Sequence, residues 1–123
     1  MNCTPHESAE QAAVFQWAAY RTGVYPELDL LYHVPNGGSR NPIEAARLKA
    51  QGVKAGVPDL VLPVARGKHH GLYIELKRQK GGRLSDDQKK WLDELTEQGY
   101  LAVRCDGAEA AIKTIEDYLR GRI

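Results

Sequence analysis

Two short runs rich in apolar and β-branched residues, at 57–65 and 71–77, predict two β-strands. The loop between them contains only glycine, basic and histidine residues, which favours a hairpin. Alternate positions of the two runs are apolar, and we expect them to form a single buried face: Leu60, Leu62, Val64, Leu72, Ile74 and Leu76.

The opposite face of this hairpin collects charged side chains. With the loop centred on Lys68, Asp59 lies opposite Lys77 and Val61 lies opposite Glu75. Directly opposed residues share a face, and diagonal neighbours lie roughly 7–8 Å apart. Asp59, Glu75 and Lys77 are therefore expected to project together, at a spacing that one or two cations can fill. The alternative is a solvated face with a cross-strand ion pair.

Helical periodicity and capping residues predict four helices. Capping residues are expected at Thr4, Asn41, Ser85 and Asp106, and the helices at about 5–22, 42–51, 86–98 and 107–119. Further strands are expected at 28–34 and 100–105. The resulting order is α-β-α-β-β-α-β-α, which indicates one α/β domain over residues 1–123, with a central mixed sheet flanked by helices on both faces.

Composition narrows the class of protein. The 123 residues are 42% hydrophobic and 27% charged, as in an ordinary globular domain. No apolar run approaches the ~18 residues of a membrane span, and the first residues carry no secretory signal. Cys3 and Cys105 are the two cysteines, which argues against a zinc site or a disulfide framework. We therefore expect a cytoplasmic protein without a membrane partner.

Basic residues are concentrated in the middle of the chain. Residues 40–90 contain 12 basic and 5 acidic residues, a balance of +7, whereas 1–39 and 91–123 each carry −3. A polyanion such as DNA would gain from these charges through counterion release. A solvated surface with chance clustering explains the charge count equally well.

The acidic cluster suggests metal-assisted hydrolysis. Asp59 and Glu75 supply the oxygen ligands that Mg²⁺ or Mn²⁺ prefers. Glu10 lies four residues before Val14, on the core-facing stripe of the first helix, and could complete the set. It could equally be solvated near the helix start. Lys77 would position the nucleophilic water or offset charge in the transition state.

Phosphate contacts are expected from two glycine-bearing loops and from the helix and linker between them. In the first loop two glycines allow backbone amides to approach an anion, although a plain strand-to-helix turn explains them as well. The second loop is basic and follows Lys77 directly. The candidate DNA-binding residues are Gly37, Gly38, Arg40, Arg47, Lys54, Arg78, Lys80 and Arg83.

The motif Pro58-Asp59, a gap of fifteen residues, then Glu75-Leu76-Lys77 resembles the PD-(D/E)xK nuclease signature. The flanking motifs are similar to those of the VRR-NUC domain, in its small stand-alone phage or bacterial form. These motifs are Asn36-Gly37-Gly38-x-Arg40, Ala46-x-Leu48-x-x-x-Gly52, Gly56-Val57-Pro58-Asp59-Leu60 and Leu84-Ser85-x-x-Gln88-x-x-Trp91-Leu92, then Gly99. The similarity extends over roughly residues 8–119.

This resemblance implies a restriction-endonuclease-like core and a Mg²⁺- or Mn²⁺-dependent DNA endonuclease. Small members of the family resemble Holliday-junction resolvases, which act on four-way junctions as homodimers. By motif position the resemblance assigns metal binding to Glu10, Asp59, Glu75 and Leu76, and catalysis to Asp59, Glu75, Lys77, Glu10 and Gln88. Glu7 is a rival of Glu10 for the helix-borne ligand.

Other functions remain open on the sequence alone. A flap or restriction-type nuclease would use the same residues on another DNA. A non-catalytic DNA-binding module would keep the scaffold, but two carboxylates without a metal would repel phosphate. Trp17 and Trp91 are expected in the core rather than as base-stacking residues, and the His69-His70 pair in a solvated turn rather than at a metal.

Overall fold

Four strands form one mixed sheet in the order β1-β2-β3-β4 in the computed structural model, which describes residues 5–35 and 41–123. β1 (Tyr32–His33) pairs antiparallel with β2 (Leu60–Leu62), and β2 pairs antiparallel with β3 (Leu72–Lys77). β3 pairs parallel with β4 (Leu101–Asp106). The expected mixed sheet is confirmed.

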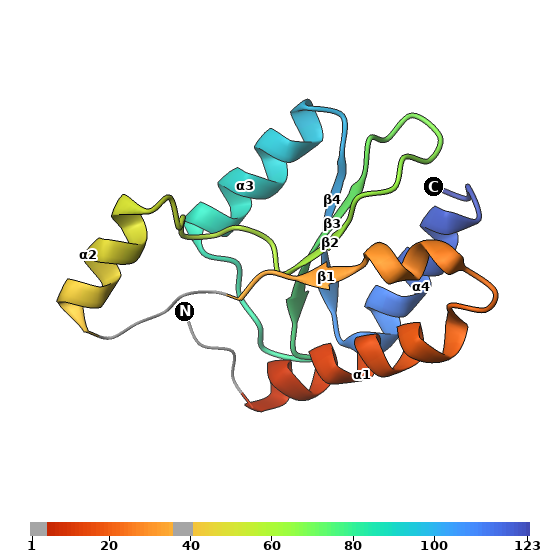
Figure 1. Ribbon diagram of the computed structural model, residues 1–123, viewed down its shortest axis with the longest axis horizontal. Coiled ribbons are helices and arrows are strands. Elements are labelled where there is room, and N and C mark those ends of the chain that lie inside the picture. The colour runs from red at the N-terminus through yellow and green to blue at the C-terminus, as the bar shows by residue number, and fades with distance from the viewer. Residues whose placement is uncertain (1–4, 36–40) are drawn as a thin grey trace.

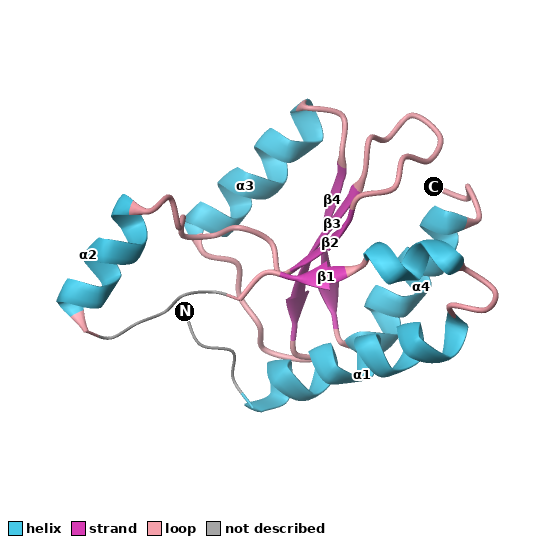
Figure 2. Cartoon of the chain, in the orientation of Figure 1, coloured by secondary structure: helices cyan, strands magenta, loops and turns pink. Residues whose placement is uncertain are grey.

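Helices cover both faces of this sheet (Figure 1). α1 (Pro5–Arg21) and α4 (Ala108–Leu119) pack together on one face, and α3 (Asp86–Glu97) packs against β4 on the other. α2 (Pro42–Ala50) projects away from the sheet and has no buried residue (Figure 2). The α/β class is therefore confirmed. No helix in the described ranges is long and apolar enough to cross a membrane.

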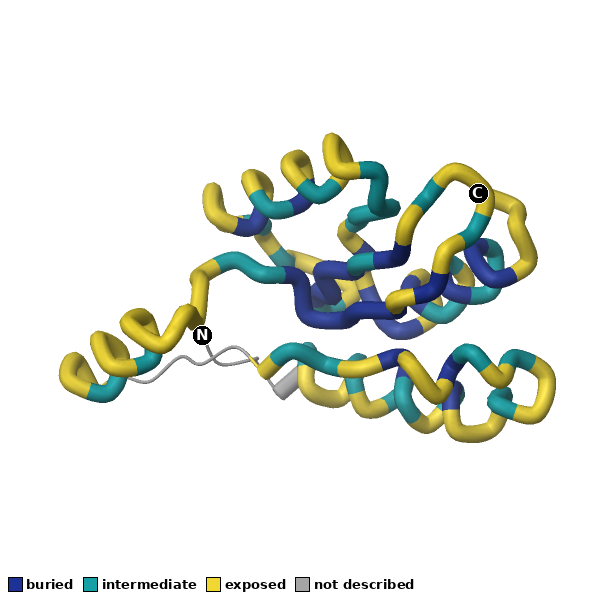
Figure 3. Tube along the Cα trace, turned by 45° about the horizontal axis from the view of Figure 1, so that its top comes forward, coloured by how far each residue is buried: buried dark blue, intermediate teal, exposed yellow. Residues whose placement is uncertain are grey.

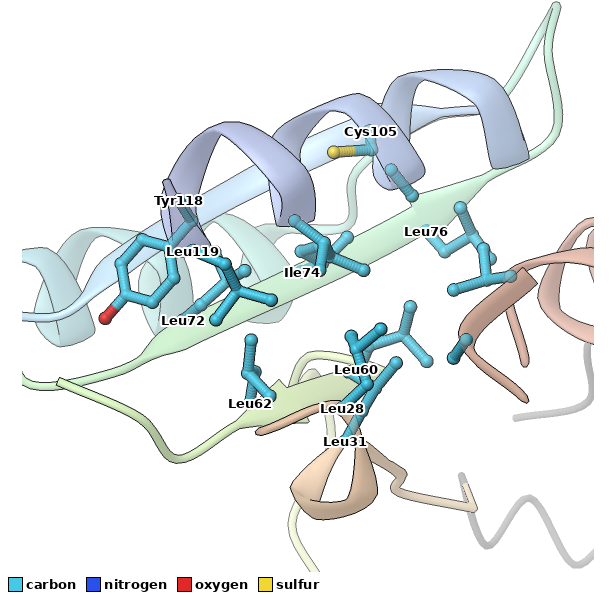
Figure 4. Close-up of a cluster of buried hydrophobic side chains, with 14 of the residues drawn as sticks. Leu28, Leu31, Leu60, Leu62, Leu72, Ile74, Leu76, Cys105, Tyr118 and Leu119 are labelled. Carbon is cyan, nitrogen blue, oxygen red and sulfur yellow. The ribbon is translucent and has the colours of Figure 1, made fainter. Parts of the chain in front are cut away.

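The main core lies between the sheet and the α1–α4 layer. Leu72, Ile74 and Leu76 alternate along β3 and point into it, where Figure 4 shows Leu72 and Ile74 near Tyr118 and Leu119 of α4. The Tyr118 hydroxyl donates to the carbonyl of Val64 at 2.6 Å, which satisfies the polar group of this buried ring. Burial of each leucine or isoleucine side chain in this core contributes about 1.5–3 kcal/mol to the free energy of unfolding. The two central strands, β2 and β3, are accordingly buried along most of their length, and Figure 3 shows dark blue segments at the centre of the molecule.

The helix starts follow their local sequence. Asn41 accepts backbone N–H groups of Ile43 and Glu44 through its side chain, and Pro42 occupies the first turn. Ser85 and Gln88 form the expected capping box at the start of α3. The cap expected at Thr4 lies outside the described residues.

The strand expected at 28–34 is largely a 3₁₀ helix, η1 (Pro26–Leu30), followed by the two residues of β1. Pro26 fixes the backbone dihedral at the first position. Backbone bonds then run from Leu28 N to the Tyr25 carbonyl and from Leu31 N to the Leu28 carbonyl. Apolar residues in 28–34 fit a strand, but a 3₁₀ helix buries an apolar residue equally well, and η1 buries Leu28 at its centre.

The hairpin register differs from the expected one by two residues. Leu60 lies opposite Ile74 and Leu62 opposite Leu72, so Asp59 falls opposite Glu75 rather than Lys77. Pro63 cannot donate to the ladder, and β2 ends at Leu62. A shift of two leaves every side chain on its predicted face. The expected grouping of Asp59, Glu75 and Lys77 on one face therefore holds.

Candidate active site

Asp59 enters the sheet at the start of β2 and is 3% exposed. Gly56 turns the chain into this position with φ +88°, and a Cβ there would lie 2.6 Å from the backbone of Asp87. One carboxylate oxygen of Asp59, Oδ2, accepts the backbone N–H of Leu76 at 2.9 Å. This bond fixes the carboxylate beyond the end of the β2–β3 ladder, beside Glu75.

Glu75 and Lys77 are buried on the same face, under the first turn of α3. Glu75 is 1% exposed and Lys77 5%. Glu75 Oε2 lies 3.6 Å from Lys77 Nζ and accepts a hydrogen bond from Gln88 Nε2 at 3.1 Å. The ammonium, the carboxylate and the amide therefore form one connected polar group.

Gln88 completes this group from α3. Its Oε1 accepts a hydrogen bond from Lys77 Nζ at 3.1 Å and another from the backbone N–H of Ser85 at 2.9 Å. The capping box therefore fixes the same side chain that touches Lys77 and Glu75. The sequence indicated a capping role and a possible contact with the cluster, and the structure contains both.

The electrostatics of the cluster favour a protonated Glu75. Burial, together with repulsion by the neighbouring Asp59 carboxylate, raises the pKa of Glu75 to about 9, although Lys77 acts in the opposite direction. Glu75 Oε1 is buried, and none of the described residues offers it an N–H or hydroxyl donor. The site therefore lacks positive charge to balance its two carboxylates, and one carboxylate oxygen lacks a donor or a cation to bind it.

The Glu10 side chain contacts the start of α4 rather than the side chains of Glu75, Lys77 and Gln88. Its Oε1 accepts the backbone N–H of Ala108 at 3.1 Å, at the start of α4. The residue at the cap of that helix is Gly107 rather than the expected Asp106, and it offers no side chain. Glu10 therefore supplies the missing cap from α1. Among the described residues, no three His, Cys, Asp or Glu side chains come together as a metal-binding group.

The expected DNA-binding residues are dispersed. Gly37, Gly38 and Arg40 lie outside the described residues. Arg47 pairs with Glu44 one turn earlier on α2, and Arg78 donates to the carbonyl of Gly81 at 3.0 Å. The remaining three are exposed: Lys54, Lys80 and Arg83.

Two residues next to the segment around Asp59 make contacts that the sequence did not predict, and Trp91, which was expected in the core, is half-buried. His33 Nδ1 lies 3.1 Å from the carbonyl oxygen of Asp59, which anchors β1 to the start of β2. Trp91 Nε1 donates to the carbonyl of Ala55 at 3.0 Å. That bond links α3 to the segment leading into Asp59. The contact of His33 follows from the pairing of β1 with β2. The apolar pattern of 28–34 did not indicate which strand this segment would pair with.

A sizeable cavity lies elsewhere, between α2 and α3. It measures about 1010 Å³ and is lined by Leu48, Val53, Trp91 and Leu95 among others, but by none of the cluster residues. Cavity size therefore does not mark the candidate site. The candidate site is marked instead by its buried charged side chains and by the Glu75 oxygen that lacks a donor.

Comparisons with known proteins match the chain to a domain family and to a solved structure. The family model described as the VRR-NUC domain matches residues 4–109. A solved structure titled "VRR_NUC domain protein" superposes with a TM-score of 0.82 at 32% sequence identity. That alignment covers 98% of this chain and 93% of the other. No curated protein matches the chain.

Proposed function

Since the chain belongs to the VRR-NUC domain family of nucleases, we propose that it is a metal-dependent endonuclease that hydrolyses phosphodiester bonds in branched DNA. The observation that carries the proposal is the buried pair of carboxylates at the start of β2. Asp59 and Glu75 lie side by side, next to an ammonium, under an amide that holds both Glu75 and Lys77. Burying these charged groups costs desolvation free energy, and a functional role would explain why the chain keeps them.

The donor set fits a divalent cation. None of the described residues offers Glu75 Oε1 an N–H or hydroxyl donor, and the raised pKa of Glu75 indicates a site that gains from added positive charge. Asp59, Glu75 and the backbone carbonyl of Leu76 would hold Mg²⁺ or Mn²⁺, which prefer such oxygen ligands. When bound, the ion supplies Lewis-acid activation of water and of the phosphoryl oxygen. Glu10 is assigned to the cap of α4.

Lys77 supplies the positive charge that the chain itself carries into the site. Its ammonium is held 3.6 Å from Glu75 Oε2 and 3.1 Å from Gln88 Oε1, so its position is set before DNA binds. A fixed ammonium stabilises the negative charge that develops on the phosphoryl oxygens without reorganising during the reaction. Gln88 is a positioning residue, since it orients both Lys77 and Glu75.

The preferred substrate is proposed to be a four-way DNA junction, cut by a homodimer. Each chain carries one cluster, and paired cuts on two strands need two clusters related by two-fold symmetry. The excess of basic residues in 40–90 supports a polyanionic substrate. We retain the expectation that the protein acts in the cytoplasm.

The test uses end-labelled four-way junction, flap, single-stranded and duplex DNA with Mg²⁺, Mn²⁺ or EDTA. Asp59→Asn keeps an oxygen that accepts from Leu76 N–H but removes the charge, and Asp29→Asn is the control at an exposed carboxylate. We expect metal-dependent paired nicks on the junction with the wild type and Asp29→Asn, and none with Asp59→Asn.

The other outcomes separate the alternatives. Cutting of the flap or the duplex in place of the junction would keep the chemistry and replace the substrate. Binding to the junction without cutting under either metal would show a DNA-binding module. Full activity in Asp59→Asn would refute the assignment of the metal site.

A further inference from the structure

Three tyrosines lie on the face of the sheet that carries the candidate cluster, two of them on either side of Val61. Tyr32 of β1 and Tyr73 of β3 both neighbour Val61 of β2, and directly opposed residues share a face. Tyr100 precedes β4 and packs its ring against Tyr73, with centroids 5.2 Å apart and an interplanar angle of 88°. We call Tyr32, Tyr73 and Tyr100 the tyrosine row.

The tyrosine row is not part of the main core. Leu72 and Ile74, which flank Tyr73 on β3, are 1% exposed and face the α1–α4 layer, so Tyr73 faces the other way. Tyr32 lies on the edge strand and is 49% exposed, while Tyr73 and Tyr100 are half-buried. One end of the row is therefore open to solvent.

The hydroxyl groups of the row are also available. Within residues 5–35 and 41–123 the structure gives these three side chains ring contacts and electrostatic effects on one another, but no hydrogen bond. Burial raises the pKa of Tyr73, and the neighbouring phenols of Tyr100 and Tyr32 raise it further.

The row lies within reach of the cluster. Tyr73 and Glu75 are two positions apart on β3 and share a face, which places them roughly 6.6 Å apart along the strand. A separation of this size allows one DNA strand to contact the row and the cluster at the same time. A base on the row would leave a phosphate of the same strand beside Glu75 and Lys77.

We propose that the tyrosine row is a stacking surface that binds an unpaired base of the DNA substrate beside the cleavage site. The proposal deepens the nuclease function above and rests on it for the identity of the ligand as DNA. Aromatic rings stack on any base, so the row would add affinity for unpaired strands without selecting a sequence. A flap presents unpaired bases, and a four-way junction presents them only where base pairs at the strand-exchange point have opened, whereas a fully paired duplex offers none.

The test measures binding by the full chain in EDTA, so that cleavage does not enter the readout. The probes are a fluorescein-labelled oligothymidylate and a labelled duplex of the same length, with fluorescence anisotropy as the signal. Tyr32→Ala removes an exposed ring from an edge strand, and Tyr32→Phe removes the hydroxyl alone. Tyr20→Ala is the matched control, because Tyr20 is 88% exposed on α1, which packs on the opposite face.

We expect Tyr32→Ala to weaken oligothymidylate binding by about 5- to 100-fold, as for the loss of one stacked base, and to leave duplex binding unchanged. Tyr32→Phe and Tyr20→Ala should bind as the wild type does. The salt dependence of binding should stay the same in all variants, since it reports phosphate contacts.

Wild-type affinity in Tyr32→Ala, or no binding of oligothymidylate by the wild type, would overturn the proposal. So would an equal loss in Tyr32→Phe and Tyr32→Ala, because the hydroxyl would then be the contact. Failure of the nuclease assignment has a different signature. In that case the wild type cuts no DNA in Mg²⁺ or Mn²⁺, while Tyr32→Ala still loses affinity for the single strand.

Discussion

Lys77 and Gln88 are joined by a hydrogen bond of 3.1 Å between the ammonium and the amide oxygen. The same oxygen accepts the backbone N–H of Ser85, and the amide nitrogen donates to Glu75. The start of α3 and the position of the Lys77 ammonium therefore depend on one side chain. A residue that looks like an ordinary helix cap is thus tied to the chemistry of the site.

The two roles of Gln88 can be separated by substitution. Gln88→Ala removes the contacts with Lys77 and Glu75, and we expect kcat to fall by about 10- to 100-fold, as for other groups that orient metal ligands. Ser85→Ala removes only the hydroxyl that accepts Gln88 N–H, and should cost about 0.5–2 kcal/mol of unfolding free energy with kcat nearly unchanged. Both quantities are measured on both variants by urea denaturation and junction cleavage. Equal kcat in Gln88→Ala and Ser85→Ala would show that Gln88 acts only as a cap.

Stability without metal should depend on the proton of Glu75. The carboxyl has a pKa of about 9 in the folded chain against a model value of 4.5, so the folded state holds a proton that the unfolded state has lost between these pH values. Its contribution is present in full below about pH 4.5 and is lost as the pH rises toward 9, by up to about 1.4 kcal/mol per pH unit. Glu75→Gln mimics the protonated form and should lack this slope. Urea denaturation in EDTA from pH 5 to 9 measures it, and parallel curves for the two proteins would refute the raised pKa.

Metal binding should release this proton. At pH 7 the folded chain carries a protonated Glu75, and a divalent cation binds the ionised carboxylate, so about one proton leaves for each ion bound. Calorimetric titration with Mn²⁺ in buffers of different ionisation enthalpy counts the protons. The affinity should rise with pH up to about 9 and level off above it. An enthalpy that is independent of the buffer would show that Glu75 is already ionised.

Much of the site could be predicted from local sequence. Alternation along 71–77 placed Glu75 and Lys77 on one face and Ile74 and Leu76 on the other, and this held even though the register moved by two. Such robustness follows from the period of two in a strand. The capping box also involves only four consecutive residues, so the pairing of Ser85 with Gln88 could be predicted without tertiary information.

Contacts between distant segments could not be predicted in this way. The cap of α4 comes from Glu10, 98 positions away in sequence, because Gly107 has no side chain to supply it. Helical periodicity correctly placed Glu10 toward the interior but could not say which partner it meets there. The tyrosine row likewise depends on the pairing of three strands and a loop, and its members are spread from 32 to 100.

The assignment of Glu10 gives the last prediction. Glu10→Ala leaves the N–H of Ala108 without its partner and removes a carboxylate from the positive end of α4, so we expect a loss of about 0.5–2 kcal/mol in unfolding free energy. Glu10→Gln keeps an accepting oxygen and should lose less. Neither variant should change the affinity for Mn²⁺, measured by calorimetry beside Glu7→Gln. A lower Mn²⁺ affinity in Glu10→Gln at unchanged stability would instead make Glu10 the third metal ligand, and the same result in Glu7→Gln would move that role one turn toward the N-terminus.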